Sequence, residues 1–216
     1  ARADVRTELG LKPDAPIVLT VGRLTEAKNY PMFFRVAQRV RSRRPDAVFL
    51  AAGHGELETS LRDLHRRMDL GDALRLLGLR RDVPRLMAAA DVFCLCSRWE
   101  GFPNVLVEAM AAALPAVTTD FAGVREIIDD NASRIALTVD RDADDRMADA
   151  ILDLLRDPDR RRAIGQAARD SVQRRFSWPR LLADMDRLYD DFLADSGTGG
   201  TDEPAGAFSR REETAP

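Results

Sequence analysis

Short apolar segments alternate with amphipathic segments through the first two thirds of this chain, and this alternation limits the possible folds more than any other feature. The apolar segments are rich in β-branched residues and almost continuously apolar, which is typical of strands buried on both faces of a sheet. They are residues 16–21, 47–52, 73–77, 91–96, 115–119 and 135–139. Between them, apolar residues recur at helical spacing in 30–44, 56–68, 83–90, 104–113 and 123–130. The sequence therefore predicts a doubly wound, Rossmann-like α/β fold, with helices on both faces of a parallel sheet.

The last part of the chain has a different pattern, without further strands. Helical segments are expected at 143–156, 158–175 and 178–194. Pro158 and Pro179 stand near the starts of the last two, where proline is tolerated. From residue 196 the sequence is rich in Gly, Thr, Glu and Pro, which predicts disorder. We therefore expect one domain over residues 1–195, ending in a helical extension, and a disordered tail over 196–216.

Composition and charge exclude several classes of protein. With 216 residues, 45% of them hydrophobic and 32% charged, the chain resembles ordinary globular domains rather than disordered or fibrous proteins. Its net charge of -3 gives no support to a nucleic-acid partner. No apolar run is long enough to cross a bilayer, and the charged start does not resemble a signal peptide. We therefore expect a cytoplasmic protein with no transmembrane segment.

The two cysteines lie two residues apart in one predicted strand. Cys94 and Cys96 therefore point to the same face of the sheet, which favours buried thiols over a disulfide. A metal site would need more ligands than this pair offers. We expect no metal.

In an open parallel sheet, ligands bind beyond the C-terminal ends of the strands. The loop after the first strand carries Arg23 and Lys28 just before a helix, and two cations there can bind a diphosphate. Alternatively, they are solvated loop charges, paired with Glu26. These residues alone do not separate the two interpretations.

The segment SRWEGFPNVLVEAM, residues 97–110, places two carboxylates around the start of a helix. Glu100 lies in the loop, and Glu108 lies about one turn into a helix for which Asn104 is the expected N-cap. Amides near Asn104, Val105 and Leu106 can receive phosphate oxygens. The two oxygens of a carboxylate match a vicinal diol, as in the ribose contacts of dinucleotide sites.

Each glutamate also has a purely structural interpretation. Glu108 would be favourable near the positive end of the helix dipole, and Glu100 would pair with the nearby Arg98.

The segments VGRLTEAKN, GLRRDVPRLMAAADVFCLCSRWEGFPNVLVEAMAAALPAV and GVREII, in this order, closely resemble the C-terminal, donor-binding domain of family-4 retaining glycosyltransferases of GT-B fold. The resemblance extends over about residues 5–194, and the two glutamates separated by seven residues are its most specific element. It implies one Rossmann-like half of a GT-B enzyme. That enzyme would transfer a hexose from a nucleotide-diphospho-sugar with retention of configuration.

The resemblance also implies roles for individual residues. Arg23 and Lys28 would hold the diphosphate of a UDP- or GDP-linked sugar, Glu108 the ribose and Glu100 the transferred sugar, so that Arg23, Lys28 and Glu100 form the catalytic set. No cofactor or divalent metal is implied. The full donor-binding set is Gly22, Arg23, Lys28, Leu79, Glu100, Gly101, Phe102, Asn104, Val105, Leu106 and Glu108.

Three positions depart from the family pattern. His54 replaces an acidic residue in a turn after the second strand, Leu114 replaces a usual glycine before the fifth strand, and Arg134 replaces another glycine. Because of these departures, we expect the loops near the donor sugar to differ in backbone geometry from those of the family.

Members of this family also carry an N-terminal domain that binds the acceptor. We therefore expect the chain to be a fragment or to have a separate partner, and to be inactive alone. The resemblance allows association with a membrane surface through that other domain. Without it, the last helix would expose an apolar face at Trp178, Leu181, Leu188 and Tyr189.

Two other functions remain open from the sequence. A binding or interaction module with the same fold but no transferase activity would fit the missing domain and the changed glycines. An unrelated receiver or reductase domain fits less well, because no G-x-G-x-x-G follows the first strand.

Overall fold

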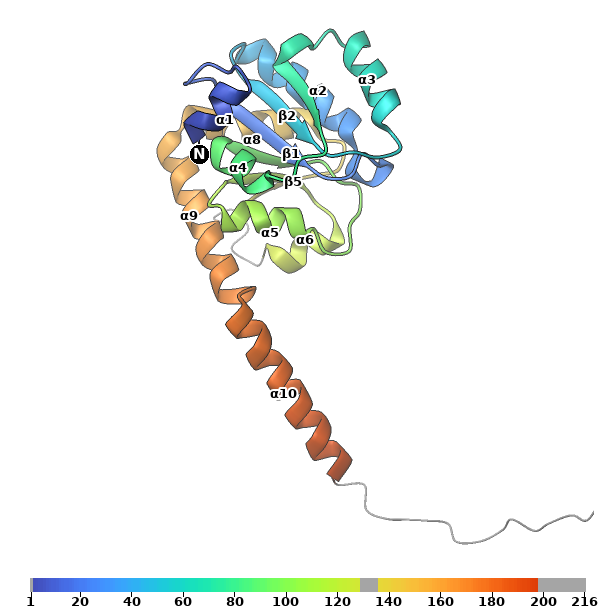
Figure 1. The fold of residues 1–216 in the computed structure, drawn as a ribbon, viewed down its shortest axis with the longest axis vertical. Helices are drawn as coiled ribbons and strands as arrows, with labels where there is room; N and C mark the ends of the chain where they lie inside the picture. The colour runs from blue at the N-terminus through green and yellow to red at the C-terminus, as the bar shows by residue number, and fades with distance from the viewer. Residues whose placement is uncertain (1, 129–135, 198–216) are drawn as a thin grey trace, which may run out of the picture. The chain divides into compact units, whose positions relative to one another are not determined.

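Six parallel strands form one sheet in the computed structural model, which describes residues 2–128 and 136–197 (Figure 1). The strands are β1 Ile17–Val21, β2 Val48–Ala52, β3 Leu74–Gly78, β4 Val92–Leu95, β5 Ala116–Thr119 and β6 Leu137–Val139. Each overlaps a predicted segment, so the strand predictions and the parallel α/β fold are confirmed. The near-continuous apolar runs arise because β1, β2, β4 and β5 are buried almost throughout.

The order of the strands is β3-β2-β1-β4-β5-β6, so the winding direction reverses at β1. Leu19 of β1 is in register with Leu50 of β2 on one side and with Phe93 of β4 on the other. The chain builds outward from β1 to β3 and then crosses back to place β4 beside β1. The loops that follow β1 and β4 therefore diverge at a topological switch point, where ligands bind in sheets of this kind.

Helices cover both faces of the sheet (Figure 1). α2 and α8 pack together over the face that carries Val18, Phe49 and Cys94. α4 packs against β1 and α5 against β4 and β5, on the other side. The helices of this unit are α1 Arg2–Glu8, α2 Tyr30–Arg43, α3 Glu58–Arg67, α4 Val83–Ala89, α5 Asn104–Ala111, α6 Ala122–Ile127, α8 Asp144–Arg156 and α9 Pro158–Arg175, with short 3-10 turns at η1 Glu26–Lys28 and η2 Gly71–Ala73.

Both cysteines are buried as free thiols, as predicted. Their sulfur atoms each lie 3.4 Å from the sulfur of Met147 in α8. Burial raises the pKa of the Cys96 thiol well above its ordinary value. The pair therefore belongs to the core between the sheet and α8.

A buried carboxylate anchors α1 to the sheet. Asp91, at the start of β4, accepts hydrogen bonds from Arg2 at 2.6 Å and Arg6 at 3.1 Å, and from the amide of Ile17 at 2.9 Å. The side chains of Arg6 and Asp91 are only 4% and 6% exposed, so this pair is protected from solvent screening.

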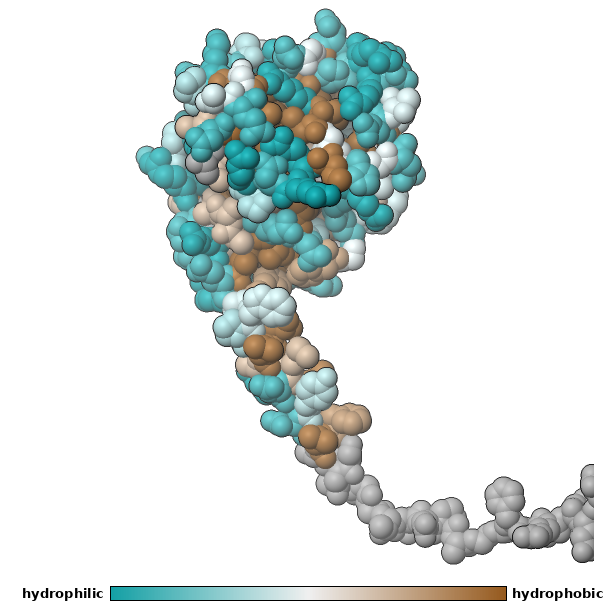
Figure 2. Space-filling model, viewed as in Figure 1, coloured by the Kyte–Doolittle hydropathy of each residue, from teal (hydrophilic) through white to brown (hydrophobic). Residues whose placement is uncertain are grey.

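The chain divides into two units, residues 1–175 and 176–216. The second unit contains α10, Trp178–Gly197, which confirms the last predicted helix. Apolar side chains are exposed along it, including the four expected ones, and Figure 2 shows brown, hydrophobic residues among paler and teal ones along this helix. They are Trp178, Leu181, Leu182, Met185, Leu188, Tyr189, Phe192 and Leu193.

Some expectations lie outside the described residues. Arg134 is one of them, and the tail from residue 198 onward is another, so the boundary after residue 195 stays a prediction. None of the helices described combines the length and the apolar composition that crossing a bilayer requires.

Candidate functional site

The loops after β1 and β4 are joined across the switch point. The amide of Arg98 donates to the carbonyl of Ala27 at 2.8 Å, and the Arg98 guanidinium forms an ion pair with Glu26 at 3.0 Å. A second ion pair links Lys28 Nζ to Glu100 Oε2 at 2.6 Å. These contacts bring the two predicted charged loops together.

The Lys28–Glu100 pair is partly shielded from water, because the two side chains are only 17% and 12% exposed. The hydroxyl of Ser97 donates to the other oxygen of Glu100 at 2.5 Å, so both carboxylate oxygens have partners. The structural alternatives had paired the loop cations with Glu26 and Glu100 with Arg98. The pairings were wrong for Lys28 and for Glu100, which pair with each other, while Glu26 pairs with Arg98; Arg23 is exposed.

Two buried residues that the sequence analysis missed support this pair. The hydroxyl of Tyr30 donates to the carbonyl of Gly22 at 2.8 Å, and the hydroxyl of Thr119 donates to the carbonyl of Ser97 at 2.5 Å. Burial raises the pKa of Tyr30, so this phenol remains a donor at neutral pH. In the sequence both resemble ordinary core residues of a helix and a strand.

Glycines allow the loops to approach one another closely. A Cβ on Gly53, whose φ is +152°, would lie 1.8 Å from the carbonyl oxygen of Gly22. A Cβ on Gly123 in α6 would lie 2.1 Å from the carbonyl oxygen of Gly101. Gly22 itself lies under the Lys28 side chain, whose Cε would be 3.0 Å from an added Cβ. Glycine at these positions therefore has a packing reason beyond ordinary turn formation.

A cavity of about 190 Å³ opens beside Gly22 and Arg23. The predicted Leu79 also lines it and is 64% exposed. Arg80 holds this wall in place, because it donates to Asp82 at 2.7 Å and to Glu8 of α1 at 2.8 Å. These hydrogen bonds raise the pKa of Arg80, so it remains a cation. The structure thus brings Gly22, Arg23 and Leu79 to one cavity.

The start of α5 differs from the prediction. Asn104 is the first residue of the helix rather than its N-cap, and Pro103 precedes it without a side-chain cap. The amides of Asn104 and Leu106 already donate to the carbonyls of Phe102 and Pro103, at 3.0 and 2.9 Å. A tight turn around the proline therefore uses two of the three amides proposed for phosphate. Val105 lies in the first turn, whose amides have no intrahelical acceptor.

The remaining predicted residues lie around this turn. Gly101 and Phe102 are exposed in the loop before α5. Glu108 is exposed on α5, and its carboxylate has no hydrogen-bond or ion-pair partner among the described residues. It is therefore accessible to a ligand from solvent.

The departures from the family pattern have local explanations. The backbone conformation that favours glycine falls at Ala113, with φ 55°, one residue before Leu114. Leu114 is instead buried, at 3% exposure. His54 is exposed, lines the smaller cavity and uses its carbonyl to accept from the Leu24 amide at 3.0 Å.

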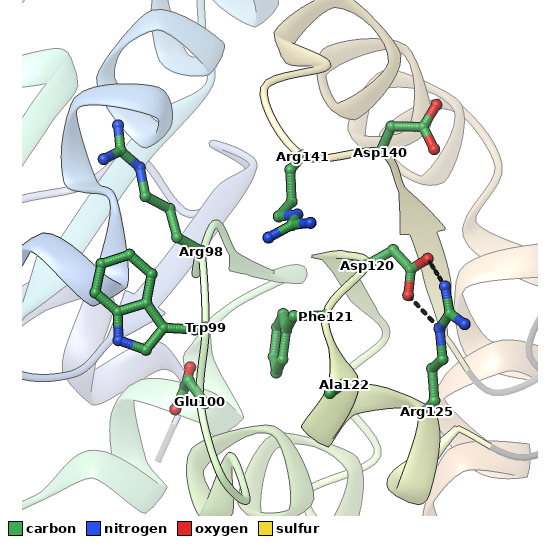
Figure 3. Close-up of a pocket in the computed structure, with 9 residues that line it drawn as sticks. All are labelled: Arg98, Trp99, Glu100, Asp120, Phe121, Ala122, Arg125, Asp140 and Arg141. Carbon is green, nitrogen blue, oxygen red and sulfur yellow. Dashed lines mark hydrogen bonds and ion pairs between the residues drawn. The ribbon is translucent and has the colours of Figure 1, made fainter.

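A second, larger cavity of about 870 Å³ lies on the other side of Glu100 (Figure 3). The loops after β4, β5 and β6 form its walls. Asp120 and Arg125 are paired through two hydrogen bonds on one wall, and this arginine lowers the pKa of Asp120. The sequence analysis assigned no role to these residues.

In the part of the chain that the structure describes, no group of three or more His, Cys, Asp and Glu side chains could hold a metal ion. The expectation that the chemistry needs no metal stays a prediction. The charges of the site instead come from Arg23 and Lys28, which suit an anionic ligand, and from Glu100 and Glu108, which can accept hydrogen bonds from hydroxyl groups.

The family described as Glycosyl transferases group 1 matches residues 1–171. Spore coat protein SA of Bacillus subtilis is 30% identical over 199 residues, which cover 88% of this chain and 52% of that protein. UDP-Gal:alpha-D-GlcNAc-diphosphoundecaprenol alpha-1,3-galactosyltransferase of Escherichia coli is 39% identical over 119 residues, which cover 53% of this chain and 30% of that enzyme. The chain thus spans about half, or less, of the length of these curated relatives.

Solved structures share the fold. HepE from Anabaena in complex with UDP superposes with a TM-score of 0.76 at 22% identity, covering 89% of this chain and 52% of that one. Sucrose-phosphate synthase from Thermosynechococcus elongatus gives a TM-score of 0.75 at 26% identity, covering 89% of this chain and 49% of that one. With the family match extending over the whole sheet and both linked loops, the chain belongs to the group 1 glycosyl transferases, and its resemblance to family-4 enzymes of GT-B fold is confirmed.

Proposed function

We propose that this chain is the donor-binding part of a retaining hexosyltransferase that uses a UDP- or GDP-linked sugar. The observation that carries the proposal is the Lys28–Glu100 ion pair at the switch point, 2.6 Å long and next to the glycine-lined cavity at Gly22. A cation and a carboxylate held side by side suit the junction between a diphosphate and a sugar. Among the relatives, the E. coli galactosyltransferase has a UDP-sugar in its name, and a mannosyltransferase of Corynebacterium glutamicum is named as GDP-mannose-dependent.

In the proposed complex the nucleotide lies over the smaller cavity. Leu79 borders the base, Arg23 and Lys28 contact the diphosphate, and Glu108 binds the ribose hydroxyls. Glu100 then orients the sugar, with the Val105 amide nearby at the start of α5.

The transfer step follows from these positions. The bond between the anomeric carbon and the diphosphate oxygen breaks, and the acceptor hydroxyl oxygen bonds to the same face of that carbon. The leaving diphosphate takes the hydroxyl proton. Arg23 and Lys28 stabilise the negative charge that develops on the leaving group, which is the main contribution expected of such preorganised cations. Transfer is proposed for the whole protein, while donor binding is proposed for this chain.

Calorimetry with UDP, GDP and ADP tests the donor site. Lys28→Met should weaken binding about tenfold or more, because charge-assisted hydrogen bonds contribute about 1.5–3 kcal/mol. Lys12→Met is the matched control, since Lys12 is the only other lysine of the chain, is exposed and lines neither of the two cavities beside Lys28 and Glu100. The assignment fails if the wild-type chain binds none of the three nucleotides, or if Glu108→Ala leaves the affinity intact.

A further inference from the structure

The larger cavity, of about 870 Å³, shares no lining residue with the smaller one near Gly22. Glu100 lines the larger cavity, while its ion-pair partner Lys28 packs over Gly22. The Lys28–Glu100 pair therefore stands at the boundary between two separate spaces. A nucleotide over the smaller space would place its sugar at Glu100, on the edge of the larger space, whose other walls remain available to a second ligand.

An exposed aromatic side chain lines the larger cavity. Trp99, directly before Glu100, is 55% exposed, whereas Phe121 on another wall is only 5% exposed. Figure 3 shows the two rings on opposite sides of Glu100. A large exposed indole presents a flat apolar surface on which the apolar face of a sugar ring can lie, with its polar edge still in water.

The charges of this cavity are paired with one exception. Arg98 pairs with Glu26 at 3.0 Å, Arg125 with Asp120 at 2.5 Å, and Asp140 with Arg146 at 3.0 Å.

Arg141 is the exception. It forms no hydrogen bond or ion pair with any residue that the structure describes, although its charge contributes, after that of Arg125, to the lowered pKa of Asp120. Figure 3 shows its guanidinium directed into the cavity between Arg98 and Asp120. A guanidinium of this kind can bind a phosphate or carboxylate through two parallel hydrogen bonds.

We propose that the larger cavity is a second ligand site, which takes a hydroxyl-rich ring carrying a phosphate or carboxylate group. The ring lies on Trp99, the anionic group binds Arg141, and a ring hydroxyl reaches toward Glu100. That this ligand is the acceptor rests on the proposed function, because the attacking hydroxyl must approach the sugar held at Glu100. The binding site itself follows from the cavity, the exposed indole and the unpaired guanidinium.

The two tryptophans of the chain provide a direct measurement. In ¹⁵N-labelled protein, Trp99 and Trp178 give separate indole NMR signals, which Trp178→Phe assigns. Glucose 6-phosphate is the probe, and glucose and inorganic phosphate are the comparison ligands. We expect glucose 6-phosphate to shift the Trp99 signal at lower concentrations than glucose does, and to leave Trp178 unchanged.

Arg141→Gln should weaken the binding of glucose 6-phosphate about threefold to fivefold, as expected for one exposed charge pair. It should leave the binding of glucose unchanged. Arg169→Gln is the control, because Arg169 is exposed on α9 and lines neither cavity. No shift of Trp99 at 50 mM probe would overturn the proposal, as would equal binding of glucose or of phosphate alone. An unchanged affinity in Arg141→Gln would overturn it as well.

UDP separates this proposal from the proposed function. If UDP does not bind to the wild-type chain, the donor assignment fails. If UDP binds but glucose 6-phosphate does not shift the Trp99 signal, only the proposal of a second site fails. Competition between UDP and glucose 6-phosphate would place both in one site and also overturn the proposal.

Discussion

Replacing Gly123 with alanine should displace the loop that carries Glu100. The added Cβ would lie 2.1 Å from the carbonyl oxygen of Gly101 and 2.8 Å from that of Glu100. Ordinary contact needs a retreat of about 1 Å or more, and the neighbours are backbone atoms that cannot rotate away. Overpacking of this kind costs about 1–3 kcal/mol, which corresponds to a fall in Tm of about 2–12 °C for a chain of this size.

Gly101→Ala is the matched control for that experiment. Gly101 lies in the same contact, but nothing stands within 4 Å of its added Cβ and its φ is not positive. Urea unfolding of both variants gives the difference in free energy, and calorimetry with UDP-glucose reports whether the loop has moved. The reasoning is refuted if Gly123→Ala is as stable as the wild type, or if Gly101→Ala loses as much stability.

Three further predictions concern the core and the end of α5. Asp91→Asn should lower the free energy of unfolding in urea by about 3–5 kcal/mol, because it leaves Arg6 buried without its counter-ion; a loss below about 1 kcal/mol would contradict this. Burial raises the pKa of Cys96 above 9.0, so the unfolded chain loses this proton first. The free energy of unfolding should then fall as pH rises above about 9, less steeply in Cys96→Ala, and an identical slope would count against the argument. Ala113→Gly should stabilise by about 0.5–1 kcal/mol in urea, because glycine relieves the left-handed conformation at some cost in chain entropy; destabilisation would refute it.

Most of the fold could be predicted because strands that are buried on both faces of the sheet appear in the sequence as short, almost continuous apolar runs. The strands at residues 17–21 and 92–95 lie within apolar runs that contain few polar residues. The start of α5 was harder to place, because a good capping residue, Asn104, follows a proline whose own turn begins the helix. Likewise, the position of the left-handed residue depends on how the helix ends at Ala111, which composition alone does not specify.

The sequence was sufficient for the order of strands and helices, for the two charged loops that meet at the switch point, and for the spacing of Glu100 and Glu108. These features depend on neighbours along the chain, through burial periodicity and turn chemistry. The pairing of Lys28 with Glu100, and of Arg98 with Glu26, joins residues 72 positions apart. Those pairs exist because the chain crosses back over β1 to place β4 beside it. The loops after the two strands then lie next to each other, and oppositely charged side chains from the two loops come within reach. The close contact at Gly123 and the cavity beside Trp99 arise from the same packing of loops.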